Sequence, residues 1–277
     1  MSSSRPVRGE SKEPIQQTNR SRKIGGTSNQ SNFESIHFQN KHLVKLFHQS
    51  FMTCEVLSTF FVLSDWLHSI NISHRNLYQL LEEVGWINEL MIEENVYPDL
   101  VEVFYSNMDT SEENKTRVIT KVRGGLINFD VSVLNSILGS SDFGLEIFSP
   151  RKSPKIASYV HVDAVRNICR GNDLSIENRT IHFHTQCLCL KTRILLRFIK
   201  SIVLPKSGHL DEVSHMDVAL IDCILRRRPI NLGYTIIRTM LTIPNLITRS
   251  LPYGSLPESL NTLRYRFMNH RVDRLRV

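Results

Sequence analysis

Residues 188–205 read LCLKTRILLRFIKSIVLP, and this stretch carries the clearest structural signal in the chain. Its apolar residues recur every three or four positions, which is the spacing of one face of an α-helix. Arg193, Arg197 and Lys200 fall on a single polar stripe of that helix. Pro205 cannot continue the helix because it has no main-chain N–H. The stretch therefore predicts an amphipathic helix over residues 188–203.

Capping residues before other apolar runs predict further helices on both sides of this one. Asn76, Asp130 and Asn231 can each accept a hydrogen bond from an N–H group in the first turn of a helix. Asp211 is expected to cap a helix in the same way, and Pro229 to end it. No internal repeat and no alternation of strands with helices interrupts this pattern.

Residues 117–129 differ from the rest, because apolar and polar residues alternate there around Gly124-Gly125. Two glycines permit the positive φ angles that a tight hairpin turn demands. The expected fold is therefore mostly α: a helical domain with one small β-hairpin at about 117–129 and disordered termini.

Composition divides the chain into four segments. Residues 1–32 are basic and rich in Ser, with too few apolar side chains to form a core, so we expect a disordered tail. Residues 33–75 are an apolar helical segment, and residues 76–255 are the main domain. Residues 256–277 are an Arg-rich C-terminal tail.

The net charge of +7 is unevenly distributed along the 277 residues. Residues 1–32 contribute six basic and two acidic side chains, and residues 261–277 contribute five and one, so each end carries +4 and the body −1. Such basic ends favour contact with nucleic-acid phosphates. Within the body, residues 76–113 hold ten acidic side chains and no Lys or Arg, whereas residues 114–260 hold 20 basic and 11 acidic ones. The two segments either attract each other, within one fold or between copies, or are simply solvated.

The cysteines and the N-terminus indicate an intracellular protein. The five cysteines are scattered and odd in number, and no apolar segment near the N-terminus resembles a signal peptide. We therefore expect reduced thiols and no secretion, with nucleus and cytoplasm both open. No stretch is apolar enough for a membrane helix, and no motif predicts a cofactor or a small-molecule ligand.

Basic residues provide the candidates for nucleic-acid contact. Cations gathered on one face can neutralise phosphates, although the same residues also suit helix ends and solvated surfaces. The candidates are Arg193, Arg197, Lys200, Arg226, Arg227, Arg228, Arg264, Arg266 and Arg271.

Two clusters suggest metal chemistry. The carboxylates Asp211, Glu212, Asp217 and Asp222 could hold the metal of a nuclease, but a capped amphipathic helix with a solvated face is the default explanation for them. The second cluster consists of potential zinc ligands at His182, His184, Cys187 and Cys189. Its spacing is more compressed than that of structural zinc sites, so core thiols and edge imidazoles are the alternative.

Several separated segments resemble a family called the putative plant transposon protein domain. The resemblance rests on Leu204–Ser214, Asn231–Tyr234 and Leu251–Gly254, preceded in the family's order by Gly85-Trp86, Phe104–Met108, Val122–Gly124 and Ile127–Phe129. It covers about residues 76–255 and leaves residues 33–75 outside. After Gly254 the sequence departs from the family, because Leu256-Pro257-Glu258 breaks the helix expected there.

The resemblance implies an origin in a plant transposable element and carries over no catalytic residue. We expect a non-catalytic module that self-associates or binds DNA or RNA, without a cofactor. The alternatives are a metal-dependent nuclease or transposase, intact or degenerate, and a silent relic.

Overall fold

The computed structural model describes residues 33–57, 64–72, 75–86, 96–111, 115–150, 152–169, 182–245 and 250–254. The disordered tails predicted at 1–32 and 256–277 lie outside these residues. Within the described ranges, no helix combines the length and the apolar character needed to cross a bilayer.

Short helices and strands alternate along the described chain. Residues 33–37 are helical. The elements up to the hairpin are α2 (Lys41–Leu46), the π-helical turn η1 (Phe47–Phe51), β1 (Glu55–Val56), α3 (Ser64–Ser69), β2 (Asn71–Ile72), β3 (Arg75–Asn76), α4 (Leu77–Glu83) and α5 (Pro98–Ser106). The next are β4 (Arg117–Val122), β5 (Gly125–Asp130), α6 (Val131–Leu138), α7 (His161–Ile168), β6 (His182–His184) and the 3-10 turn η4 (Thr185–Cys187). The last are α8 (Leu190–Phe198), the π-helical turn η5 (Ile199–Val203), β7 (Glu212–Ser214), α9 (His215–Leu225), α10 (Leu232–Met240), η6 (Ile243–Asn245) and β8 (Ser250–Leu251).

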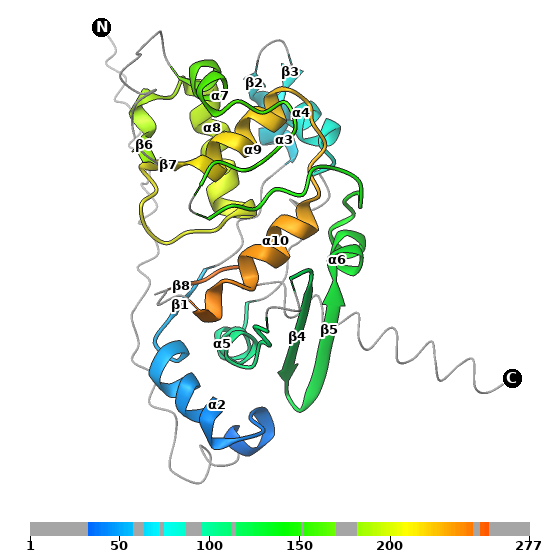
Figure 1. The fold of residues 1–277 in the computed structure, drawn as a ribbon, viewed down its shortest axis with the longest axis vertical. Helices are drawn as coiled ribbons and strands as arrows, with labels where there is room; N and C mark the ends of the chain where they lie inside the picture. The colour runs from blue at the N-terminus through cyan, green and yellow to red at the C-terminus, as the bar shows by residue number, and fades with distance from the viewer. Residues whose placement is uncertain are drawn as a thin grey trace, which may run out of the picture.

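Helix α9 is the centre of one half of the molecule, where it packs against α7 and α8 (Figure 1). Every residue from Met216 to Ile224 is buried, so this helix is enclosed on all sides. Helix α10 packs against α6 and leads into the other half. That half contains α5, the β4–β5 hairpin and α2 with η1 (Figure 1).

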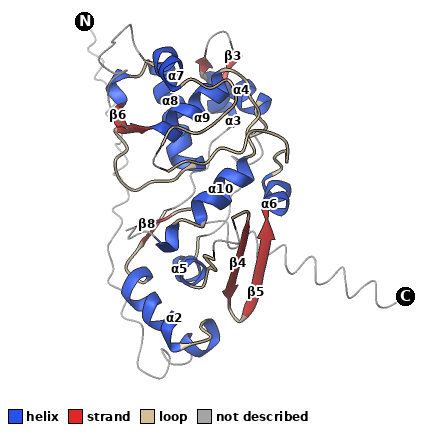
Figure 2. Ribbon diagram, in the orientation of Figure 1, coloured by secondary structure: helices blue, strands red, loops and turns tan. Residues whose placement is uncertain are grey.

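The prediction of a helical domain with a single hairpin is wrong. About 51% of the described residues are helical and 16% lie in strands, and these strands form four two-stranded sheets (Figure 2). The sheets besides the hairpin pair β1 with β8, β2 with β3, and β6 with β7. Their strands are only two or three residues long. A strand that short contains too few residues for alternation to be recognised in the sequence.

The β4–β5 hairpin lies where the sequence places it, but its turn comes one residue earlier. Arg123 and Gly124 have φ angles of 49° and 71°, and Val122 pairs with Gly125. Two positive φ angles at the centre of a two-residue loop are the mark of a type I′ turn. Gly125 is therefore a strand residue and not part of the turn.

Three of the predicted helix caps are confirmed. The side chains of Asn76, Asp130 and Asn231 each accept a hydrogen bond from an N–H group in the first turn of α4, α6 and α10. These caps join residues three positions apart, so local sequence is enough to specify them.

The cap predicted at Asp211 is wrong. Ser214 caps α9, and Asp217 accepts a hydrogen bond from the Ser214 N–H in return. Residues Glu212–Ser214 are extended because they pair with His182–His184 as a small sheet. The helix therefore begins three residues later than the sequence suggested, after a strand whose partner is distant in the chain.

Residues 33–57 belong to the same core as the rest of the described chain. Phe47 and Phe51 are buried, and η1 packs against α5. Asn107 Nδ2 donates a hydrogen bond to the carbonyl of His37 at 2.9 Å. Strand β1 pairs in parallel with β8, which lies at the far end of the described chain. The segment that falls outside the resemblance therefore completes the fold.

Candidate functional site

Helix α8 presents part of its basic stripe to solvent. The apolar face around Leu195 is buried, whereas Lys191 and Arg197 are exposed and Arg193 is half-buried. The helix contains no acidic residue, and within the described ranges none of these three cations has an acidic partner. Two neighbouring cations, Arg193 and Arg197, lie one turn apart on this helix, as phosphate contact requires.

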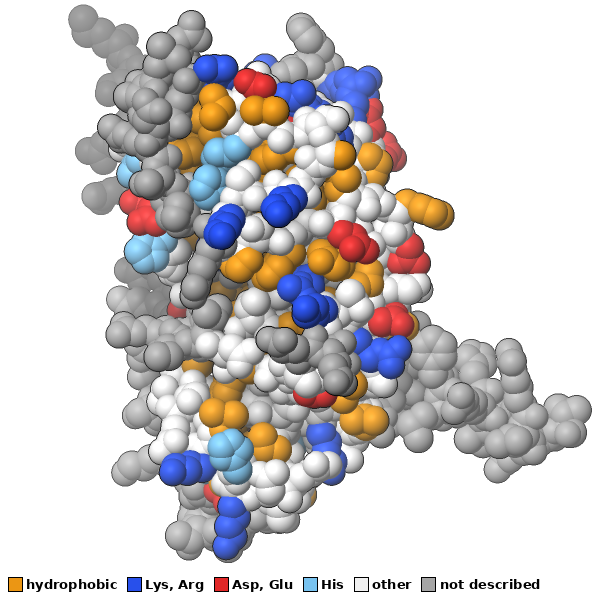
Figure 3. All heavy atoms as spheres, viewed as in Figure 1, with side chains coloured by type: hydrophobic (Ala, Val, Ile, Leu, Met, Phe, Trp, Pro, Cys, Tyr) orange, Lys and Arg blue, Asp and Glu red, His pale blue; other side chains and the backbone are white. Residues whose placement is uncertain are grey.

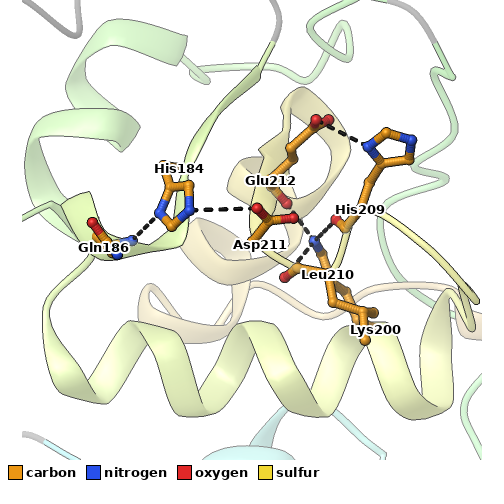
Figure 4. Close-up of polar contacts among 7 residues, drawn as sticks. All are labelled: His184, Gln186, Lys200, His209, Leu210, Asp211 and Glu212. Atoms are coloured by element: carbon orange, nitrogen blue, oxygen red, sulfur yellow. Dashed lines mark hydrogen bonds and ion pairs between the residues drawn. The ribbon is translucent and has the colours of Figure 1, made fainter.

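Lys200 ends the basic stripe but lies beneath the following loop. Its Nζ donates hydrogen bonds to the carbonyls of His209 at 3.0 Å, Leu210 at 3.2 Å and Glu212 (Figure 4). Burial lowers the pKa of the Lys200 ammonium, although the nearby carboxylate of Asp217 opposes this shift. Three carbonyls saturate the three donors of an ammonium group. Lys200 was predicted to contact phosphate, but in the structure its ammonium group is already bonded to the loop.

The loop that Lys200 holds also carries two exposed histidine–carboxylate pairs (Figure 4). His184 Nε2 lies 3.4 Å from Asp211 Oδ2, and His209 Nδ1 lies 3.0 Å from Glu212 Oε1. Exposed pairs of this kind contribute only about 0–1 kcal/mol each. The loop Leu204–Ser214 is thus fixed mainly by the ammonium of Lys200 and not by its surface charges.

The four carboxylates predicted as catalytic candidates have separate structural environments. Asp217 is fully buried at the first turn of α9, with its Oδ2 bonded to the Ser214 N–H and 3.7 Å from Lys206 Nζ. Asp222 is buried and accepts a hydrogen bond from Arg226 Nε at 2.8 Å. Asp211 and Glu212 face histidines, as described above. Within the described ranges, no three His, Cys, Asp or Glu side chains come close enough to hold a metal ion.

The predicted zinc ligands are engaged in other contacts where the structure describes their side chains. His184 Nδ1 accepts a hydrogen bond from the Gln186 N–H, and Cys189 Sγ lies 3.3 Å from Thr192 Oγ1. Burial acts to raise the pKa of the Cys189 thiol, but hydrogen bonds at the start of α8 lower it on balance. Cys187 is half-buried, and the side chain of His182 lies outside the description.

The arginines at the end of α9 have protein partners. Arg226 bonds to Asp222, and Arg227 Nε lies 3.2 Å from Glu83 Oε2. Arg228 donates to the carbonyls of Ala157 and Ser158. The Arg227–Glu83 pair joins the basic and acidic segments of the sequence within one fold. Arg264, Arg266 and Arg271 lie outside the described residues.

Basic side chains are dispersed on the face of the molecule seen in Figure 3. Lys and Arg side chains alternate there with hydrophobic and uncharged ones over α7, α9 and α10, without merging into one patch. The described residues of this face therefore form no continuous basic patch.

A buried amide network, which the sequence analysis missed, surrounds the start of α10. Asn135 Nδ2 donates to Asn231 Oδ1 at 2.9 Å and to Asp142 Oδ1 at 2.8 Å. Asn135 Oδ1 accepts hydrogen bonds from the Gly233 N–H and the Ser140 hydroxyl, both at 2.8 Å. A Cβ on Gly233 would lie 2.5 Å from Asn135 Oδ1. Only glycine at this position lets α10 approach α6 this closely.

The end of the described chain is fixed by two buried tyrosines. Tyr253 donates a hydrogen bond to the carbonyl of Val203 at 2.7 Å, and Tyr105 donates one to the carbonyl of Pro252 at 2.9 Å. A Cβ on Gly254 would lie 2.9 Å from the carbonyl oxygen of Leu57. These contacts tie three distant parts of the chain together.

A family model described as putative plant retrotransposon-related domain matches residues 82–263. The chain belongs to this family. This match confirms the resemblance to plant transposon-derived domains. No curated protein and no solved structure matches the chain.

The segments that carried the resemblance hold the retrotransposon-related domain together. Lys200 anchors Leu204–Ser214, Asn135 holds Asn231–Tyr234, and the two tyrosines fix Leu251–Gly254. Each contact joins a segment to a residue elsewhere in the fold. These three segments therefore contribute to the architecture of the domain.

The retrotransposon-related domain also contains a histidine pair that no motif in the sequence predicts. His161 and His215 begin α7 and α9, and His161 Nε2 lies 2.8 Å from His215 Nδ1. The Tyr159 hydroxyl lies 2.9 Å from His161 Nδ1. Burial, and then the neighbouring His215, lowers the pKa of His161 to about 4. The pair is 54 positions apart in the chain, so no local pattern could show it.

We expect acid to destabilise the domain through His161. An unfolded histidine takes up a proton as the pH falls through 6.5, whereas folded His161 remains neutral until about pH 4. The contribution of His161 to the free energy of unfolding is therefore fully present above pH 6.5 and decreases as the pH falls from 6.5 to 4. A half-buried group shifted this far should account for about 1–2 kcal/mol after screening. Urea unfolding at pH 7.5 and pH 4.5 measures the difference.

In the His161→Gln variant, the difference in the free energy of unfolding between pH 7.5 and pH 4.5 should be smaller by about 1–2 kcal/mol. His209→Gln is the matched control, because the His209 side chain is 80% exposed. Equal pH dependence in the two variants would show that His161 does not cause the effect.

Proposed function

We propose that this plant retrotransposon-related domain binds nucleic acid without catalysing a reaction on it, using Lys191, Arg193 and Arg197 of α8 to contact phosphates. The observation that supports this is the lack of acidic partners for these three cations within the described ranges. Arg226 and Arg227 at the end of α9, by contrast, are paired with the carboxylates of Asp222 and Glu83, whereas Arg193 Nε donates to the carbonyl of Leu188.

Phosphate contact would give binding that depends steeply on salt and little on sequence. Each neutralised phosphate releases condensed counterions, so the log–log slope of affinity against salt changes by about 0.7–0.9 per contact. An exposed arginine also suits phosphate because its guanidinium can donate two parallel hydrogen bonds. Duplex DNA and single-stranded RNA are both candidates for the partner.

The test is a salt titration of binding to labelled duplex DNA and single-stranded RNA, with the full chain. Replacing Lys191, Arg193 and Arg197 together by Gln should lower the log–log slope by about 2–3. The matched control replaces Lys152, Lys155 and Arg166 by Gln, which removes the same charge. Lys152, Lys155 and Arg166 are exposed and lie away from α8 along the chain. The control should keep the slope of the unsubstituted chain.

Two outcomes would contradict the proposal. Equal slopes in the α8 variant and the unsubstituted chain would place the contacts elsewhere, such as at Arg264, Arg266 and Arg271. No binding by the full chain at low salt would exclude nucleic acid as the partner of α8. Circular dichroism of each variant confirms that the comparison is between folded proteins.

A further inference from the structure

The two edges of the β4–β5 hairpin differ in their hydrogen bonds to the rest of the fold. On β4, the carbonyl of Ile119 accepts a hydrogen bond from the Asp109 N–H at 2.8 Å. The carbonyl of Lys121 accepts one from Asn107 Nδ2, also at 2.8 Å. The outer edge of β4 is therefore closed by the end of α5.

The register shows which groups β5 turns outward. Ile119 pairs with Asn128, and Lys121 pairs with Leu126. Residues opposite each other in an antiparallel pair direct their N–H and C=O groups either both inward or both outward. The main-chain carbonyls of Ile119 and Lys121 accept hydrogen bonds from outside the hairpin. The main-chain N–H and C=O groups of Leu126 and Asn128 therefore also point outward, at the outer edge of β5. Within the described ranges, no hydrogen bond to these outward groups is made.

The β5 edge lacks the features that usually prevent strand pairing. Natural edge strands are protected by proline, by inward charges, by lysine or by a bulge. Residues 125–129 read GLINF, without a charge, a proline or a bulge. Leu126 is 60% exposed on the open face of the hairpin. Figure 1 shows β5 as the outer strand of the hairpin on that side of the molecule.

Exposed apolar side chains continue from this edge onto α6. Val133 is 41% exposed in the first turn of α6, and Phe143 is 83% exposed. The Ser132 hydroxyl donates to Asp142 Oδ2 at 2.6 Å, so the loop that carries Phe143 lies beside that first turn. An open edge strand with apolar side chains at its end is a binding surface for another strand.

We propose that a second copy of this chain covers this surface, with β5 pairing antiparallel to β5 about a two-fold axis at Asn128. The positions that turn outward, 126, 128 and 130, are spaced evenly about Asn128. The carbonyl of Asp130 already accepts the first hydrogen bond of α6, so that axis uses the carbonyl of Leu126, both groups of Asn128 and the N–H of Asp130. Leu126 then lies opposite the partner's Asp130, and Asn128 lies opposite the partner's Asn128. The four-stranded sheet has the order β4, β5, β5, β4.

Charge and packing agree with a second copy as the occupant. Like charges directly opposite each other destabilise strand pairs, and this register places none there. Amide side chains at the axis can bond to each other across the interface. The first turn of α6, with Val133, lies next to the partner's Leu126, so an apolar residue of each copy loses its exposure. Such an isologous interface closes as a dimer instead of growing into a fibre.

Cysteine substitution tests the register directly. The axis places the two Asn128 Cα atoms about 5.5 Å apart, within the range of a disulfide. In the same register, the two Leu126 Cα atoms of the dimer lie about 13 Å apart, because they are offset by four residues along the strands. Mild oxidation of the full chain should therefore yield a covalent dimer for Asn128→Cys. It should yield no more dimer for Leu126→Cys than the native thiols give in the unsubstituted chain.

Sedimentation measures the interface without a crosslink. Asn128→Pro removes an outward N–H and leaves the β4–β5 hydrogen bonds in place, and Leu126→Lys adds a protective edge charge. Each should raise the dimer dissociation constant by roughly tenfold or more. Asn128→Thr, which keeps the N–H, should retain the dimer. Circular dichroism checks that each variant is folded.

Three results would overturn the proposal. They are a chain that stays monomeric at all concentrations, a dimer that both edge variants leave unchanged, and equal crosslinking at positions 126 and 128. A monomer whose Leu126 and Asn128 amides resist hydrogen exchange would show that another segment of the same chain covers the edge. The dimerisation tests are independent of the proposed phosphate binding by α8, because the β5 variants leave every α8 cation in place.

Discussion

A chain that begins at residue 76 is expected to lose cooperative folding, although it contains the whole of the family match at residues 82–263. Strand β1 would be missing, so Ser250 and Leu251 would lose the partners Glu55 and Val56. The hydrogen bond from the Leu57 N–H to the carbonyl of Leu251 would be lost as well. Residues 250–254 would then lose the backbone partners that the structure describes for them.

The free energy of the lost burial is comparable to the stability of an ordinary domain. Residues before position 76 contribute five large apolar side chains to the core, which are Phe38, Phe47, Phe51, Leu67 and Ile72. Each contributes about 1.5–3 kcal/mol when fully buried. Their sum reaches the 5–15 kcal/mol that typically separates folded from unfolded proteins. Urea unfolding of residues 76–277, followed by circular dichroism, should show no cooperative transition.

The matched control is residues 33–277, which removes only the tail that the sequence predicts to be disordered. This chain should unfold with the same midpoint as the full chain. A cooperative transition of residues 76–277 at that midpoint would show that the N-terminal segment is an appendage. Experiments on the domain alone should therefore begin at residue 33, not at the start of the family match.

Gly233→Ala is expected to destabilise the domain by about 3 kcal/mol or more, because it creates a clash inside a buried polar network. Its Cβ would lie 2.5 Å from Asn135 Oδ1 and 3.0 Å from the carbonyl oxygen of Val131. Relief of the clash requires α10 to move away from α6. That movement would leave the Asn135 amide, which is 1% exposed, without its hydrogen bonds.

Gly208→Ala is the matched control for this prediction. Gly208 lies in another segment that carried the resemblance, but it is exposed and a Cβ there would meet no atom within 4 Å. Its substitution should change the free energy of unfolding by less than about 0.5 kcal/mol. Urea unfolding of both variants measures the difference. Similar values for the two would contradict the role of Gly233 in the packing of α10 against α6.

The organisation of the family has a physical explanation in these contacts. Lys200, Asn135 and the two tyrosines each hold a segment that lies far away in the sequence. A short segment fixed by a buried polar contact tolerates few substitutions, because a lost partner leaves a buried group unsatisfied. Such segments are easy to recognise in a sequence. The cations proposed to bind phosphate on α8 lie outside the segments that carried the resemblance, whereas Asn128 of the surface proposed on β5 lies within one of them, Ile127–Phe129.

The features that depend on near neighbours in the chain could be predicted from local sequence. The caps at Asn76, Asp130 and Asn231, the amphipathic α8 and the position of the hairpin all involve residues a few positions apart. Their physical basis is the period of the helix and of the strand, together with N–H groups that a nearby side chain can satisfy.

The features that join distant residues depend on the tertiary structure and could not be predicted from local sequence. Strand β7 replaced the first turn of the expected helix because it pairs with β6, and β1 became a strand because β8 lies beside it. Lys200 looks like a surface cation in the sequence, yet the loop after it folds back and buries the ammonium under three carbonyls. Periodicity shows which residues share a face of a helix. What covers that face depends on chain segments that meet only in the folded state, and the same is true of the His161–His215 pair.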